Sequence, residues 1–242
     1  MICHLANSLW VSINGRRARR FRAALRDPMQ TQQRLLAQML ACHAASAFGR
    51  AHGFDRIRSW DEYRDRVPLR SGQDYVPWID RIRHGEQRVL TVERVNRLMP
   101  TSGTTNQPKL VPFTNGFQRQ FTAAIGPWVV DLFRRYPDLK RGPAYWSISP
   151  AIESDSRSSA VPIGFDDDSQ YLGGWSKALV EKTFAVPSCV SRFLDVDQWR
   201  LATLFWLLRA RELRLFSVWH PSFLDLLFEA LTTHWKLHLN PS

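Results

Sequence analysis

Residues 97–113 contain a polar loop between two short apolar segments, and this succession constrains the fold more than any other part of the chain. Arg97–Pro100 and Leu110–Phe113 have the composition of strands. Between them lies Thr101-Ser-Gly-Thr-Thr-Asn-Gln-Pro-Lys109. Thr114 can then cap a long helix over about residues 116–135. The segment therefore predicts strand, loop, strand and helix in direct succession.

The loop combines several features of an anion-binding turn. Gly103 allows the backbone to turn sharply and to bring its amides close to a ligand. Lys109 adds a positive charge at the end of the loop. Hydroxyl groups come from Thr101, Ser102, Thr104 and Thr105. The loop predicts a phosphate site, but not the G-x-x-x-x-G-K-S/T type, whose second glycine it lacks. The alternative is an ordinary polar surface loop.

Helix and strand signals alternate along the rest of the chain. Helices are predicted to start at Asp27-Pro28, Ser59, Ser71 and Pro221, and over 33–48 and 197–210; strands are predicted over 144–149 and 213–218; and 153–174 reads as loop. We expect Gly49 and Gly53 to end the helix over 33–48. Strands that alternate with helices predict an α/β fold, with a sheet flanked by helices.

The net charge of +11 comes mostly from arginine, since only five of the 33 basic residues are lysine. Arginines are scattered along the chain, which argues against a nucleic-acid or membrane partner. The densest run, Arg16 to Arg22, lies in a basic N-terminal segment (residues 1–26) and is interpreted as the solvated face of a helix. Nucleic-acid binding is the weakest alternative.

Three widely spaced cysteines, Cys3, Cys42 and Cys189, form neither a disulfide framework nor a metal motif. They favour a reducing compartment, and no apolar run is long enough to span a bilayer, so we expect a cytoplasmic protein. We expect no metal site in this chain.

The loop resembles the signature [S/T]-S-G-T-[S/T]-x-x-P-K of adenylate-forming enzymes, which are acyl-CoA synthetase-like. The flanks resemble the auxin-responsive GH3 family of acyl-acid-amido synthetases, bacterial type. They are Ala47-Phe-Gly-Arg-Ala-His-Gly-Phe54, Tyr63 to Pro68, Ile79-Asp-Arg-Ile-Arg-His-Gly-Glu86 and Ser217-Val-Trp-His-Pro-Ser-Phe-Leu224. The resemblance runs in order from about residue 30 to residue 242.

The resemblance implies a ligase that uses ATP and Mg²⁺ to convert a carboxylic acid to an acyl-adenylate. An amino acid then attacks the adenylate to form an amide. It also implies that the ATP phosphates contact Thr101, Ser102, Gly103, Thr104, Thr105 and Lys109. One departure is Asn106, where many such loops have glycine. The catalytic residues, the acid and the amine are not identified by these motifs.

The later nucleotide motifs of the family have no match in the sequence. We therefore expect residues 27–242 to be an incomplete N-terminal part of the adenylating domain. We expect the Mg²⁺ ligands, the rest of that domain and the mobile C-terminal domain to lie outside this chain, and a truncated chain to catalyse no ATP–pyrophosphate exchange by itself. The missing C-terminal portion is then a possible partner. The alternatives are an acid–thiol (CoA) ligase and a non-catalytic fragment.

Several aromatic residues are candidates for an acyl pocket. Trp128 is one of them, and Trp219 is the preferred one, because it ends a predicted strand, where α/β folds bind ligands. Aromatic residues at helical or strand spacing also form ordinary core. Both interpretations remain open for these two tryptophans.

Overall fold

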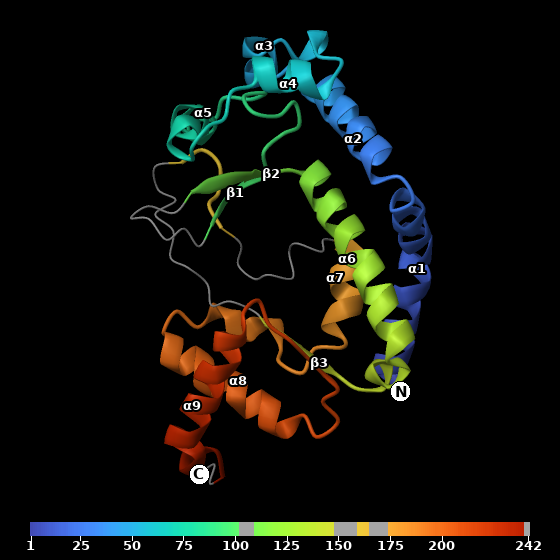
Figure 1. The fold of residues 1–242 in the computed structure, drawn as a ribbon. Coiled ribbons are helices and arrows are strands. Elements are labelled where there is room, and N and C mark those ends of the chain that lie inside the picture. Colours follow the sequence, from blue (N-terminus) through green and yellow to red (C-terminus); the bar gives the residue numbers. More distant parts are fainter. Residues whose placement is uncertain (102–108, 148–158, 165–173, 240–242) are drawn as a thin grey trace. The chain divides into compact units, whose positions relative to one another are not determined.

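The computed structural model describes residues 1–101, 109–147, 159–164 and 174–239 (Figure 1). Its helices are α1 (Ile2–Ala24), α2 (Pro28–His43), α3 (Ala47–Ala51), α4 (Trp60–Arg66), α5 (Val76–Arg83), α6 (Asn115–Arg135), α7 (Gly174–Glu181), α8 (Val196–Arg209) and α9 (Pro221–Leu239). Its strands are β1 (Arg97–Pro100), β2 (Leu110–Phe113), β3 (Ala144–Trp146) and β4 (Leu215–Ser217). Short 3₁₀ turns cover Phe54–Arg56, Gln73–Tyr75, Pro137–Arg141 and Ser188–Arg192. The fold described is mostly helical.

The predicted single sheet is corrected by the structure. Among the described residues, β1 pairs antiparallel with β2, and β3 pairs parallel with β4 in a separate sheet. The strand positions were predicted well, but the described part of the chain contains two two-stranded sheets instead of one larger sheet. Local sequence specifies where a strand forms, whereas its partner depends on contacts between distant segments.

The chain divides into two compact units. The first unit comprises Met1–Ala18, Phe121–Glu153 and Phe165–Ser242, and the second comprises Arg19–Gln120 and Ser154–Gly164. The boundary predicted at residue 26 separates a basic segment from an adenylating domain, and it stays a prediction.

The core of the second unit forms where α5 packs beside β1. Helix α5 buries Ile79 and Ile82 on one face, three residues apart. Leu98 of β1 is completely buried in the same cluster. Val89, Val95 and Val161 complete the buried set. This core holds the strand that enters the polar loop.

The first unit contains two buried clusters. In one, Trp10 of α1 packs with Val129 and Phe133 of α6 and with Val180 of α7. The other surrounds β3 and the pair α8 and α9, which lie together in Figure 1. Its buried residues are Tyr145, Val186, Val190, Trp199, Leu204 and Leu227.

Three predicted helix starts are confirmed by cap hydrogen bonds. The Asp27 carboxylate accepts from the Gln30 amide at 2.9 Å, and Ser59 Oγ accepts from the Glu62 amide at 3.2 Å. Thr114 Oγ1 accepts from the Phe117 amide at 3.1 Å. Each cap satisfies a backbone donor that the first helical turn leaves unpaired.

Two predicted boundaries are wrong. Helix α2 ends at His43, and Gly49 lies inside α3 instead of ending a helix over 33–48. The reason is Ser46, whose hydroxyl accepts from the Gly49 amide at 2.9 Å and starts a new helix. Ser71 does not cap α5 either, because its amide and hydroxyl donate to the Asp74 carboxylate at 2.6 and 2.8 Å.

Removing the Asp27 cap is expected to lower the free energy of unfolding. Asp27→Ala leaves the Gln30 amide without its acceptor, and the loss should be about 1 kcal/mol. Urea denaturation followed by circular dichroism measures it. Asp27→Ser is the matched control, because serine can cap equally well, and an equal loss in both variants would contradict the capping role.

Helix α1 confirms that the N-terminal arginine run is helical, and Arg16, Arg19, Arg20 and Arg22 are exposed on it. Over the part of the chain that the structure describes, no helix has the length and apolar character needed to cross a bilayer. All three cysteines are free.

Candidate functional site

The predicted phosphate loop leaves and re-enters the fold through the antiparallel pair of β1 and β2. Leu98 lies opposite Pro112, and Pro100 lies opposite Leu110. The pairing continues one step further, because the Thr101 amide donates to the Lys109 carbonyl at 2.8 Å. The two ends of the loop are therefore fixed next to each other.

Strand β1 is also held on its other side. The Leu98 amide donates to the Pro162 carbonyl at 2.9 Å, and the Leu98 carbonyl accepts from the Gly164 amide at 2.8 Å. Arg97 Nη1 donates to the Gly164 carbonyl at 3.2 Å. Strand β1 is therefore fixed by backbone hydrogen bonds on both edges, and the side chain of its residue Leu98 is buried in the core. The loop thus begins from a rigid base.

The exit from the loop leads directly into α6, whose first turn is capped by a carboxylate from a distant segment. Glu93 Oε2 accepts from the Gly116 amide at 2.6 Å, and Glu93 Oε1 accepts from Arg119 Nη2 at 3.0 Å. Gly116 leaves room for this carboxylate, because a Cβ at position 116 would lie 2.4 Å from Glu93 Oε1 in its present position. Negative charge at a helix N-terminus is stabilising.

Glu93 should make stability depend on pH. Burial disfavours its carboxylate, but the hydrogen bonds from the Gly116 amide and the Thr114 hydroxyl, together with the Arg119 charge, lower its pKa below the ordinary 4.5. A lowered folded-state pKa contributes stability above pH 4.5, which is lost as the pH falls through the folded-state value.

We therefore expect Glu93→Gln to reduce the free energy of unfolding at pH 7 and to change it much less near pH 3. Urea denaturation at both pH values tests this. Glu229→Gln is the control, since that exposed side chain lies on α9. A pH-independent effect of Glu93→Gln would rule out the charge as its cause.

Lys109 lies at the start of β2 with an exposed side chain that packs over Gly72. A Cβ built at Gly72 would lie 2.6 Å from Lys109 Cε and 3.1 Å from Nζ. The ammonium group therefore reaches the turn that the Asp74–Ser71 hydrogen bonds close. Sequence spacing gave no sign of this contact, because Gly72 and Lys109 come from separate segments.

The structure thus describes two of the six residues that are predicted to contact the ATP phosphates. Thr101 and Lys109 are both exposed and are joined across the base of the loop. Ser102, Gly103, Thr104 and Thr105 lie outside the described residues, as does Asn106. The phosphate contacts of all six residues stay predictions.

The first predicted pocket residue, Trp128, is 44% exposed on α6. Its ring meets Trp146 of β3 edge to face, with centroids 5.7 Å apart, and Trp146 in turn meets Trp10 at 5.9 Å. Trp146 Nε1 is buried and has no hydrogen-bond partner among the described residues.

The neighbouring residue Tyr145 is part of the core, and burial raises the pKa of its hydroxyl to about 12, so it stays neutral at physiological pH.

The second predicted pocket residue, Trp219, follows β4 and is 63% exposed. The parallel pairing sets Trp146 opposite Ser217, and the Ser147 amide donates to the Ser217 carbonyl at 2.8 Å. Trp146 and Trp219 therefore belong to the carboxyl ends of paired parallel strands, an edge where α/β folds commonly bind ligands. Both tryptophans lie in the first unit, whereas Thr101 and Lys109, the two ends of the loop, belong to the second.

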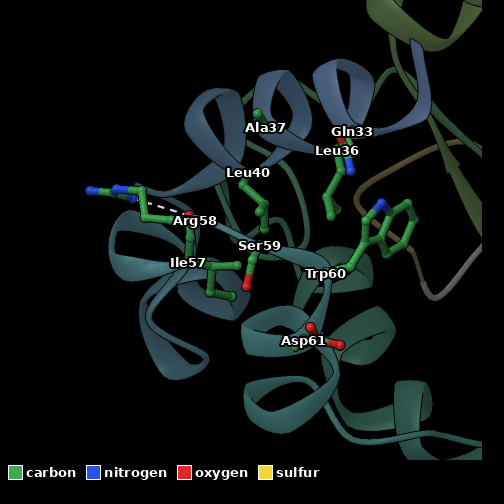
Figure 2. Close-up of a pocket in the computed structure, with 9 residues that line it drawn as sticks. All are labelled: Gln33, Leu36, Ala37, Leu40, Ile57, Arg58, Ser59, Trp60 and Asp61. Atoms are coloured by element: carbon green, nitrogen blue, oxygen red, sulfur yellow. Dashed lines mark hydrogen bonds between the residues drawn. The ribbon is translucent and has the colours of Figure 1, made fainter. Parts of the chain in front are cut away.

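A small cavity of about 310 Å³ lies in the second unit, between α2 and the start of α4. Figure 2 shows Trp60 beside Leu36 and Gln33, while Arg58 points away. Arg58 Nη1 donates to the Ile57 carbonyl at 3.1 Å. None of the described residues of the hairpin, 97–101 and 109–113, lines this cavity. Within the described ranges, no three His, Cys, Asp or Glu side chains are grouped as metal ligands.

Comparison with known proteins identifies relatives of the chain. Residues 17–240 match the model of the GH3 family N-terminal domain. The chain is 30% identical over 97 residues to "Jasmonoyl--L-amino acid synthetase GH3.5" of Oryza sativa subsp. japonica, covering 39% of this chain and 17% of that protein.

Two solved structures are similar in fold. One is "GH3.15 acyl acid amido synthetase", with a TM-score of 0.67 and 20% identity. The other is "AtGH3.15 acyl acid amido synthetase in complex with 2,4-DB", with a TM-score of 0.69 and 18% identity. Each match covers 86% of this chain, and this chain spans only 37% and 36% of the respective structures.

Proposed function

Because the chain belongs to the GH3 family, we propose that it is the phosphate-binding part of an ATP-dependent acyl-acid-amido synthetase. In this reaction a carboxylate oxygen attacks the α-phosphorus of ATP, forming an acyl-adenylate and releasing pyrophosphate. The amine of an amino acid then attacks the acyl carbon, an amide bond forms and AMP leaves. The bacterial type of the family is part of this proposal.

The observation that carries the proposal is the fixed base of the loop. Thr101 and Lys109 are hydrogen-bonded at the end of a hairpin that is held on both edges. Such a base lets a Ser/Thr/Gly loop present its amides to a phosphate chain with little loss of conformational entropy on binding. Lys109 supplies the mobile positive charge beside it.

The same proposal assigns a role to each of the predicted site residues. Thr101, Ser102, Gly103, Thr104, Thr105 and Lys109 contact the ATP phosphates, and Trp128 and Trp219 line the acyl pocket. Mg²⁺, which neutralises phosphate charge during adenylation, takes its ligands from outside this chain. Residues 27–242 contribute to the adenylating domain.

The experiment that tests the proposal is titration of the full chain with Mg–ATP, followed by calorimetry. We expect saturable ATP binding. We also expect pyrophosphate to compete with ATP more strongly than AMP does, because the loop holds the phosphate chain. Absence of ATP binding would contradict the proposal.

The reaction type is tested on a protein in which this chain is joined to the rest of a GH3 synthetase. Acid-dependent ATP–pyrophosphate exchange reports adenylation, and mass spectrometry of the product distinguishes an amide from a thioester. A thioester with coenzyme A, and no amide, would favour the acid–thiol ligase instead.

A further inference from the structure

The second unit contains an open cleft of about 750 Å³ that none of the sequence motifs predicted. The end of α2, helix α3, the 3₁₀ turn Phe54–Arg56 and the end of α4 form its walls. Three arginines line it, one from each of the last three elements: Arg50, Arg56 and Arg66. Of the hairpin, the described residues 97–101 and 109–113 do not contribute to it.

Positive charge in this cleft exceeds negative charge. Asp55 is the only carboxylate among the lining residues described, so the formal balance is three positive charges against one negative. Arg56 Nε lies 3.9 Å from Asp55 Oδ2, with both side chains mostly exposed. An ion pair of this length and exposure is weak.

The other two arginines have no acidic partner. Arg50 Nη1 donates to the Ala45 carbonyl, which positions the guanidinium without neutralising it. Arg66 Nη1 lies close to Gly53, 3.4 Å from where a Cβ would stand. Throughout the described ranges, no carboxylate lies within 4.0 Å of Arg50 or Arg66 in an ion pair. Their donors are thus available to a ligand.

The wall of the cleft behind these arginines is preformed. His52 is buried and stacks on Phe48, with ring centroids 4.1 Å apart. Its Nδ1 lies 2.8 Å from the Phe48 carbonyl and must donate, while its Nε2 lies 3.0 Å from Arg70 Nη2 and must accept. The ring is therefore held at both nitrogens. Gly53, with φ of 61°, turns the backbone sharply after it.

We propose that this cleft binds a small molecule through its phosphate group. Guanidinium groups form charge-assisted, paired hydrogen bonds with phosphate oxygens. Two unneutralised positive charges match a phosphate dianion better than a single carboxylate. The volume falls within the range of about 300–1,000 Å³ typical of small-molecule sites. Thr101 and Lys109 do not line this cleft, and the proposal does not depend on the function proposed for the loop between them.

The test uses inorganic pyrophosphate as the probe and calorimetry at low salt, on the full chain carrying Lys109→Ala to weaken the loop. We expect one saturable site. Arg50→Gln and Arg66→Gln should each weaken binding by about tenfold or more, because each removes a charged donor from the bound phosphate.

Arg64→Gln is the matched control, since it removes the same charge from α4 at a residue that pairs with Asp61 and does not line the cleft. It should leave the affinity unchanged, and circular dichroism verifies that every variant is folded. The proposal is overturned if the Lys109→Ala chain binds no pyrophosphate. It is equally overturned if Arg64→Gln weakens binding as much as the cleft variants, or if the cleft variants change nothing.

Discussion

Replacing Lys109 with alanine is expected to weaken Mg–ATP binding by about tenfold to a hundredfold. A hydrogen bond to a charged group contributes about 1.5–3 kcal/mol, and each 1.4 kcal/mol corresponds to a factor of ten. The Lys109 side chain is exposed, and it takes part in none of the ion pairs between described residues. Its loss should therefore affect the ligand more than the fold.

Two further variants are compared with Lys109→Ala to test this prediction. Lys182→Ala removes an equally exposed lysine from the first unit and should leave ATP affinity unchanged. Lys109→Arg keeps the charge and should retain part of the affinity. Calorimetric titration of all three gives the comparison. If Lys109→Ala binds ATP as tightly as the unaltered chain, the phosphate-loop assignment is wrong.

Truncating Phe133 should produce the largest loss of stability. Phe133 is 1% exposed on α6, and its ring meets Trp10 of α1 with centroids 6.4 Å apart. It packs with Val129 and Val180 in the same cluster. Phe133→Ala removes apolar contacts and leaves a cavity, so the free energy of unfolding should fall by about 3–5 kcal/mol. That is a large share of the roughly 5–15 kcal/mol by which domains are stable.

Urea denaturation monitored by circular dichroism measures this loss. Phe228→Ala is the control, because Phe228 of α9 is 51% exposed, and its change should stay within about 1 kcal/mol. Phe133→Leu, which refills most of the cavity, should recover much of the stability. Equal losses at Phe133 and Phe228 would show that the α1–α6 cluster does not stabilise the chain as described.

Sequence reasoning succeeded where the signal is local. The bounds of β1 and β2 agree with the prediction, as do the caps at Asp27, Ser59 and Thr114. It failed at Ser71, because a neighbouring carboxylate, Asp74, competes for the same turn. A cap can be recognised from its own sequence only when no nearby acceptor engages the capping hydroxyl.

Sequence reasoning also missed every contact between distant segments. Glu93 caps α6 from 23 residues away, and Gly72 lies against the side chain of Lys109. Arg50 and Arg66 lie in two of the flanking blocks noted in the sequence. Their positions in the sequence did not indicate that they line one cleft with Arg56, because the three arginines come from three separate short elements.

The sequence by itself determined the family and the strand–loop–strand segment, because these depend on residue types at fixed local spacing. The tertiary structure decided which strands pair, where Lys109 packs and where the three cleft arginines gather. The physical reason is that strand partners and charge clusters are set by packing between segments far apart in the chain. Local propensity does not encode those distances.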